Sequence, residues 1–155
     1  MDYRETLLQE FERYQKELLP AYQFTTSAAM KDAKKLGLFK KKKFGGYIAD
    51  FKSHMEAGMS QIAKLDLLEI PEEDEKSREV ADALRKSLRS FCLLCDFNVE
   101  FYDMTEKKQY PGSGVTIKSY TKACDEMQSV LMRAVEDAAA LEKAYEKYQT
   151  DDLAN

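Results

Sequence analysis

Apolar residues recur every three or four positions in four separate stretches of the chain, a spacing that places them along one face of an α-helix. The most apolar stretch covers residues 80–102, where Val80, Leu84, Leu88 and Phe91 begin a stripe. Further apolar residues widen this stripe until little of the circumference is polar, so the helix must be buried on more than one side. The pattern predicts that the segment around Phe91 is the central helix of an all-α bundle.

The other three stripes predict helices over residues 3–36, 47–67 and 117–148. Pro20 lies inside the first of these stripes, where it removes a backbone hydrogen bond and crowds the preceding turn. We therefore expect a kink at Pro20, or a break that starts a new helix. Short connections between the stripes favour an antiparallel bundle of four helices, or of five if the first helix is broken.

Turn-forming residues and charge mark the connections between the stripes. Acidic residues follow Pro71, and those from Glu72 to Glu75 are predicted to form the first turn of the central helix, because negative charge is favourable at a helix N-terminus. The Pro-Gly-Ser-Gly sequence that begins at Pro111 is typical of a loop. Both connections are short enough to join antiparallel neighbours.

Composition and charge narrow the class of protein. The 155 residues are 44% hydrophobic and 34% charged, which suits one domain over residues 1–150 with a frayed tail over residues 151–155. The net charge is −4, yet residues 31–43 contain seven lysines and one acid, so nucleic-acid binding across a whole face is not expected. No apolar run is long enough to span a bilayer, and the odd number of cysteines fits a reducing compartment, so we expect a cytoplasmic protein.

A basic segment connects the first two predicted helices. Clustered lysines with flanking rings are suited to grip phosphates or to lie on an anionic membrane, with the rings stacking on bases or entering the lipid. The alternative is a solvated connection, because consecutive lysines point in every direction around a helix and repel one another. The segment consists of Phe39, Lys40, Lys41, Lys42, Lys43 and Phe44.

Tyrosines and methionines are frequent on the predicted apolar stripes. The chain contains nine tyrosines, seven methionines and no tryptophan. Because a tyrosine keeps a polar tip and a methionine repacks easily, stripes of this kind often border a partner instead of filling a dry core. The alternative is an ordinary core periphery. The tyrosines expected to contact a partner are Tyr14, Tyr22, Tyr145 and Tyr148.

Three cysteines and the single histidine form a candidate metal-ligating set. Cys92 and Cys95 lie one helical turn apart, and Cys124 and His54 lie on the inner stripes of two other helices, so three thiolates and an imidazole could hold zinc. The alternative is that the cysteines are small hydrophobic core residues, since no second paired motif supports a zinc knuckle. We expect His54 to bond with a neighbouring helix or with water, and we expect the buried amide of Asn98 to find partners and to set the helix register. We expect no cofactor.

The sequence shows no recognisable catalytic arrangement, since it has one histidine, no glycine-rich phosphate loop and no acidic pair on one apolar stripe. We therefore predict a small, acidic, non-catalytic binding protein, such as an adaptor, inhibitor or antitoxin-like regulator. It would dock on another protein, or on a second copy of itself, through tyrosine- and methionine-rich helix surface, steered by the lysine segment. The alternatives are direct binding of nucleic acid or an anionic membrane by the lysines, and a metal-binding bundle.

Overall fold

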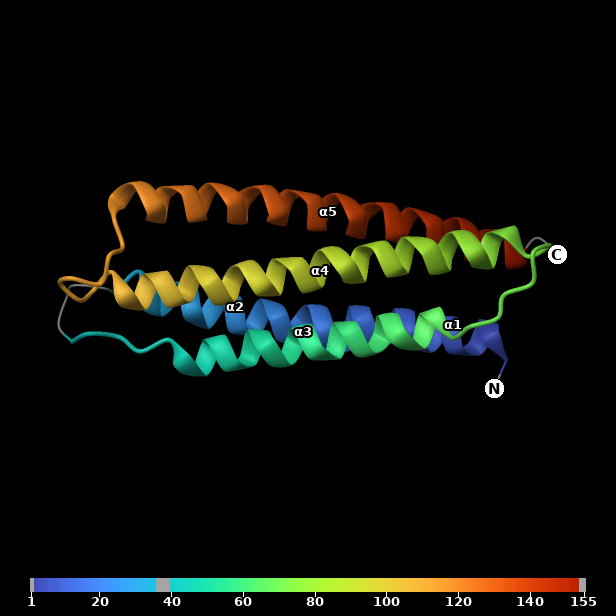
Figure 1. The fold of residues 1–155 in the computed structure, drawn as a ribbon. Coiled ribbons are helices and arrows are strands. Elements are labelled where there is room, and N and C mark those ends of the chain that lie inside the picture. The colour runs from blue at the N-terminus through green and yellow to red at the C-terminus, as the bar shows by residue number, and fades with distance from the viewer. Residues whose placement is uncertain (1, 36–39, 154–155) are drawn as a thin grey trace.

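The computed structural model describes residues 2–35 and 40–153, which fold into four long helical rods (Figure 1). Successive rods run antiparallel, so the predicted all-α, antiparallel four-helix bundle is confirmed. The first rod consists of α1 (Tyr3–Arg13), the π-helical turn η1 (Tyr14–Leu18) and α2 (Leu19–Ala33). The other rods are α3 (Gly45–Asp66), α4 (Glu75–Lys107) and α5 (Ile117–Leu153).

Pro20 perturbs the first rod without breaking it. Because proline has no N–H to donate to the preceding turn, the chain widens into η1 just before it, and the Leu19 N–H donates to the Tyr14 carbonyl, five residues back. The backbone stays helical, with φ and ψ of −67° and −54° at Leu18 and of −62° and −46° at Leu19. The predicted disturbance is therefore a π-helical turn, and the five-helix alternative is wrong.

The start of α4 follows from local capping chemistry. Asp74 is the N-cap, and its side chain accepts a hydrogen bond from the Ser77 backbone N–H. The helix therefore begins at Glu75. Glu72 and Glu73, which were predicted to lie in its first turn, precede the helix instead.

The connection between α4 and α5 contains two glycines in a backbone conformation that other residues rarely adopt. Gly112 and Gly114 have φ of 78° and 82°, in the left-handed region. α5 itself continues as far as Leu153, into the predicted tail over residues 151–155. The last two residues of that tail lie outside the described part of the chain.

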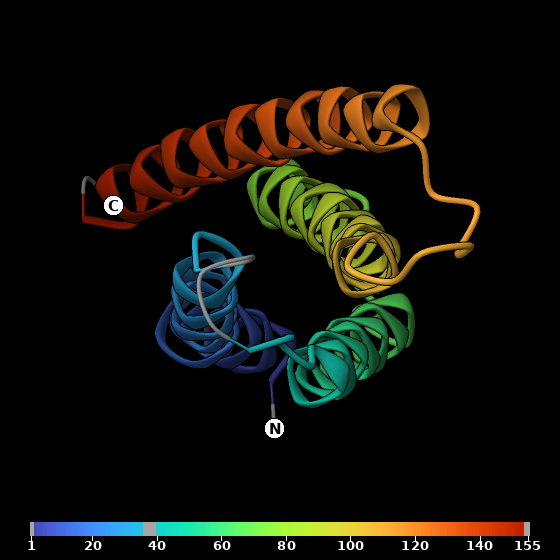
Figure 2. The same cartoon turned by 90° about the vertical axis from the view of Figure 1, so that its left-hand side faces the viewer.

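The core lies around α4, whose main neighbours are α3 on one side and α5 on the other (Figure 2). Phe91, near the middle of α4, is buried and meets the rings of Tyr14 and Tyr22 edge-on. The predicted central position of the segment around Phe91 is confirmed. The largest fully buried apolar side chains also include Phe44, Phe51, Leu84, Leu88 and Tyr102.

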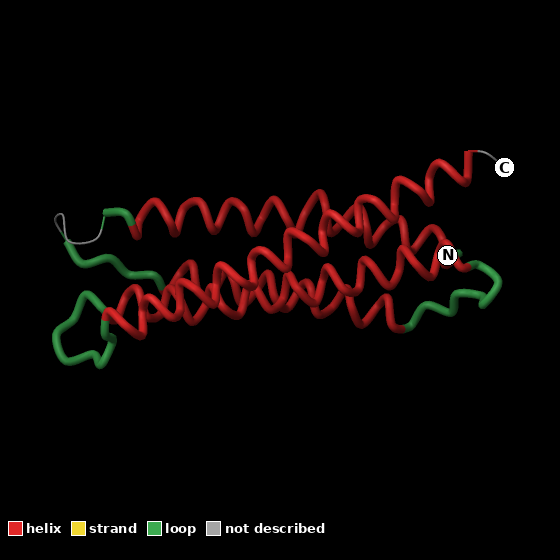
Figure 3. Tube along the Cα trace, turned by 90° about the horizontal axis from the view of Figure 1, so that it is seen from above, coloured by secondary structure: helices red, strands yellow, loops and turns green. Residues whose placement is uncertain are grey.

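α5 is inclined to the first rod, so the two diverge along the bundle (Figures 2 and 3). At one end, called here the closed end, the Tyr145 ring stacks on Phe11 with centroids 3.8 Å apart, and the Tyr148 hydroxyl lies 3.1 Å from Ser77 Oγ. At the opposite end, called here the open end, α2 finishes and α5 begins, and the two helices are apart. The inclination of α5 therefore leaves one side of the bundle uncovered.

Asp74 also ties the closed end together. Its carboxylate accepts hydrogen bonds from the Tyr3 hydroxyl, the Arg4 guanidinium and the Ser77 hydroxyl. Partial burial alone would raise the pKa of Asp74, but these hydrogen bonds outweigh it and hold the pKa at about 2, below the ordinary 3.8. The proton is therefore bound more tightly by the unfolded chain than by the folded one.

We expect acid to destabilise the bundle through this carboxylate. The contribution of Asp74 is complete above about pH 4 and is lost as the pH falls toward about 2, and solvent screening limits the loss to about 1–2 kcal/mol. Urea unfolding followed by circular dichroism across this range measures it. The matched variant Asp74→Asn still offers a capping oxygen. Its stability should lack this part of the pH dependence, and an unchanged acid profile would contradict the assignment.

Candidate functional site

The lysine segment lies in the connection between α2 and α3, and the side chains of residues 40–43 are exposed or half-buried. Lys41 Nζ lies 4.4 Å from the ring centroid of Tyr110. The Lys42 N–H donates to Gln109 Oε1, and the Lys42 carbonyl accepts from Gln109 Nε2, each at 2.7 Å. These bonds attach the connection to the turn that follows α4 and leave the lysine side chains at the surface.

Of the two phenylalanines that flank the lysines, the structure describes Phe44. Phe39 lies outside the described residues. Phe44 is fully buried, its ring stacks on Tyr102 with centroids 5.6 Å apart, and its N–H donates to Glu106 Oε1. A nucleic-acid base or a lipid would reach the Phe44 ring only if the ring left the core. The surface of this segment therefore carries the charges of the lysines, and the Phe44 ring is not part of that surface.

The four tyrosines expected at a partner surface divide between two places. Tyr145 and Tyr148 lie at the closed end, where they make the contacts described above. Tyr14 and Tyr22 lie at the bottom of the opening between the first rod and α5, where Tyr22 Oη accepts a hydrogen bond of 3.0 Å from Asn98. Burial raises the pKa of both phenols, so they stay neutral hydrogen-bonding groups near pH 7.

The structure does not gather the candidate metal ligands. His54 Nε2 lies 2.9 Å from Thr25 Oγ1 on α2, which confirms that this histidine bonds to a neighbouring helix. In the part of the chain that the structure describes, no three His, Cys, Asp or Glu side chains form a group that could hold a metal ion. The metal-binding alternative has no preformed site among its candidates, which are His54, Cys92, Cys95 and Cys124.

The two cysteines of α4 pack as core residues. Burial raises the pKa of the Cys92 thiol to about 11 and raises the pKa of the Cys95 thiol further. Both groups therefore stay protonated near neutral pH, and a protonated thiol is a poor nucleophile and a poor metal ligand. Cys92 also lies where α3 and α4 approach closely, because a Cβ built on Gly58 would come within 2.7 Å of its sulfur.

An apolar groove, called here the α2–α5 groove, follows the opening between the first rod and α5, with α4 as its floor. It consists of two hollows of about 430 Å³ and about 350 Å³ that share Tyr22, Leu94 and Leu131. On α5 the lining residues run from Tyr120 at the open end to Glu142 toward the closed end, a length of about 33 Å. The two hollows therefore lie next to each other along the opening, over roughly the length of a 20-residue helix.

Both walls of the α2–α5 groove expose apolar side chains. On α5, Leu131 is exposed and Val135 is 61% exposed, and on α2 Met30 is 49% exposed. Large apolar patches on a protein surface commonly mark interaction sites, because they gain free energy when they are covered. α5 thus has one apolar face against α4 and a second that no other described helix covers.

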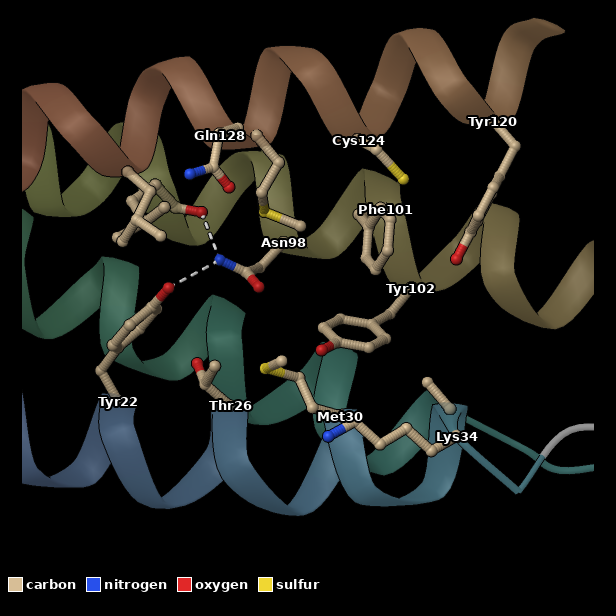
Figure 4. A pocket seen from close by; sticks show the side chains of 14 residues that line it. Tyr22, Thr26, Met30, Lys34, Asn98, Phe101, Tyr102, Tyr120, Cys124 and Gln128 are labelled. Atoms are coloured by element: carbon tan, nitrogen blue, oxygen red, sulfur yellow. Dashed lines mark hydrogen bonds between the residues drawn. The ribbon is translucent and has the colours of Figure 1, made fainter. Parts of the chain in front are cut away.

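Two buried polar side chains interrupt the apolar floor of the larger hollow (Figure 4). Asn98, which is 2% exposed, donates to Tyr22 Oη at 3.0 Å and to the Leu94 carbonyl at 2.8 Å. The bond to Tyr22 joins α4 to α2, as expected for a buried amide at this position. Tyr102, which is 1% exposed, brings its hydroxyl to the same hollow.

The α2–α5 groove is only partly predictable from the sequence. The apolar stripe of the last helix includes Leu131 and Ala138, but it omits Val135, and Met30 lies outside the stripe of the first helix. A signal for the groove is present in α5, because Met132 and Val135 widen the apolar arc of the stripe through Leu131 and Ala138.

Comparisons of the chain with protein-family models, with curated proteins and with solved structures found no match. Within the described ranges, no helix has a segment long and apolar enough to cross a bilayer.

Proposed function

We propose that this chain is a non-catalytic binding protein whose α2–α5 groove receives an amphipathic helix of a partner protein. The observation that carries the proposal is the groove itself, about 33 Å long between walls that expose Met30, Leu131 and Val135. A helix laid into the groove would bury these side chains and cover the open side of the bundle. An adaptor, inhibitor or antitoxin-like regulator could act in this way.

The spacing of the lining residues supports a helical partner. On α5, Cys124, Leu131, Val135 and Ala138 follow one another at intervals of seven, four and three residues along the groove. A partner helix with apolar residues at similar intervals would meet them turn by turn. The small side chain of Ala138 would let the two helix axes come close together.

Charge along the groove supports a particular composition and direction of that helix. Lys34 lines the open end, where the lysine segment also lies, and Glu142 lines the groove toward the closed end. A helix with acidic residues at the open end and basic residues at the closed end would be complementary, and its approach would be steered by the lysines. Because acidic residues stabilise helix N-termini, its N-terminus would lie at the open end.

Direct binding of nucleic acid or an anionic membrane by the lysine segment is the alternative, and it has the support of the exposed lysines alone. The buried Phe44 ring contributes nothing to it. The proposal includes a cytoplasmic location, because Cys92, Cys95 and Cys124 are free thiols, as is usual in a reducing compartment.

Selection of peptides from a displayed library of amphipathic helices tests the proposal. The full chain is immobilised beside the variants Leu131→Glu and Ala140→Glu. We expect enriched peptides to show helical periodicity and to lose at least about tenfold in affinity on Leu131→Glu, because a carboxylate would have to be desolvated in the groove. Ala140 is exposed on α5 and does not line the groove, so Ala140→Glu should bind as the wild type does.

Peptides without helical periodicity, or equal binding to both variants, would contradict the proposal. Concentration-dependent dimerisation that only Leu131→Glu abolishes would identify a second copy of the chain as the occupant. Binding of a single-stranded oligonucleotide or of anionic vesicles that is lost on reversing the charge of Lys40 to Lys43 would favour the alternative.

A further inference from the structure

Two polar groups in the larger hollow of the α2–α5 groove can form further hydrogen bonds. Asn98 Nδ2 is occupied by Tyr22 Oη and by the Leu94 carbonyl, but Asn98 Oδ1 accepts no hydrogen bond from any residue that the structure describes. The Leu94 carbonyl can only accept, so it fixes which side-chain atom of Asn98 is the nitrogen. Figure 4 shows the remaining oxygen on the side toward Met30 and Tyr102.

The Tyr102 hydroxyl is a second polar group of this kind. Its ring is stacked with Phe44 and with Phe51, at centroid distances of 5.6 Å and 5.7 Å, which fixes where the hydroxyl lies. The hydroxyl faces the larger hollow, and Figure 4 draws no hydrogen bond from it to the other lining residues. Because both side chains line the hollow, these two groups together suit an occupant that brings a polar atom.

We propose that the larger hollow is the anchor site of the groove. It takes one aromatic side chain with a hydrogen-bond donor, a tyrosine or tryptophan of the partner helix, whose O–H or N–H donates to Asn98 Oδ1. This inference rests on the proposed function and names the residue that the partner must carry. Aromatic anchors with a polar tip are the side chains that most often dominate the binding energy of protein interfaces.

The rest of the hollow fits such a side chain. Met30, Met127 and Leu131 line it, and methionine thioethers make favourable contacts with aromatic rings. An aliphatic anchor would cover these residues but would leave Asn98 Oδ1 unpaired. A carboxylate brings no proton for that oxygen, and a lysine ammonium would lose its hydration in a largely apolar hollow. An aromatic donor matches both the lining and the leftover acceptor.

Side-chain analogues test the anchor site on the full wild-type chain by NMR titration. 3-Methylindole is compared with 3-methylbenzothiophene, and p-cresol with p-xylene, because each pair differs chiefly in the donor. We expect saturable shifts of the Asn98 side-chain amide and of the Met30 and Met127 methyl groups. The donor of each pair should bind about tenfold more tightly, because the analogue without it leaves a buried acceptor unpaired.

A matched pair of variants tests whether the preference for the analogue with a donor depends on Asn98. Asn98→Leu should still bind p-xylene but lose the preference for p-cresol. Gln128→Leu removes another amide from the lining of the same hollow and should keep the preference. If Asn98→Leu folds poorly, the paired analogues on the wild-type chain still decide the question.

Equal affinity within each pair, or no saturable binding of any analogue, would overturn the anchor site while leaving helix docking to its own test. Failure of helix docking can also be recognised separately. If the analogues bind with the expected preference but no helical peptide is ever selected, the hollow binds free aromatic molecules, and both the partner helix and its anchor residue are refuted.

Discussion

Replacing Phe91 with alanine should lower the free energy of unfolding by about 3–5 kcal/mol. The ring is buried in the middle of α4 and meets Tyr14 and Tyr22 at centroid distances of 6.2 Å and 5.8 Å. Its removal would cost the buried apolar area and would leave a cavity between α4 and the first rod. Domains of this size have total stabilities of about 5–15 kcal/mol, so the loss would be a large share of the whole.

The exposed phenylalanine of α2 provides the control. Phe24 is 80% exposed, so Phe24→Ala should change the free energy of unfolding by less than about 0.5 kcal/mol. Urea unfolding at neutral pH, followed by circular dichroism, measures both variants. Similar losses for Phe91→Ala and Phe24→Ala would mean that the core does not lie around the middle of α4.

The helices and their order are predictable because they depend on local patterns. The stripe through Val80 and Phe91 predicts a buried central helix, and the missing N–H of Pro20 predicts a disturbance near it. What the pattern does not give is the form of that disturbance, because a widened π-helical turn leaves the apolar stripe almost unchanged. The sequence pattern predicts the start of α4 a few residues too early, because Asp74 caps the helix instead of lying inside it.

The candidate site is less predictable because it depends on contacts between distant parts of the chain. Phe44 follows four lysines and resembles a surface residue, yet its N–H is bound by Glu106 and its ring packs on Tyr102. The groove arises from the inclination of α5 to the first rod, which no local spacing encodes. A stripe identifies Leu131 as apolar, but only the tertiary arrangement shows that no described helix covers it.

The second large effect is expected at Ala138, which lines the smaller hollow of the α2–α5 groove. An indole side chain at this position would fill the hollow and occupy the space of the partner helix. Such a clash is worth about 3 kcal/mol, which corresponds to a loss of affinity of about 100-fold. Because Ala138 is only half-buried, the added side chain can lie along the groove, and the helical circular dichroism of Ala138→Trp should match the wild type.

Affinity of the selected helical peptide for Ala138→Trp, compared with Ala140→Trp, tests most directly whether the α2–α5 groove is the docking site. Both changes place the same side chain on α5, but only the first points it into the groove. We predict a loss of about 100-fold for Ala138→Trp and a change of less than about twofold for Ala140→Trp. Wild-type affinity in a folded Ala138→Trp chain would show that the partner helix binds elsewhere.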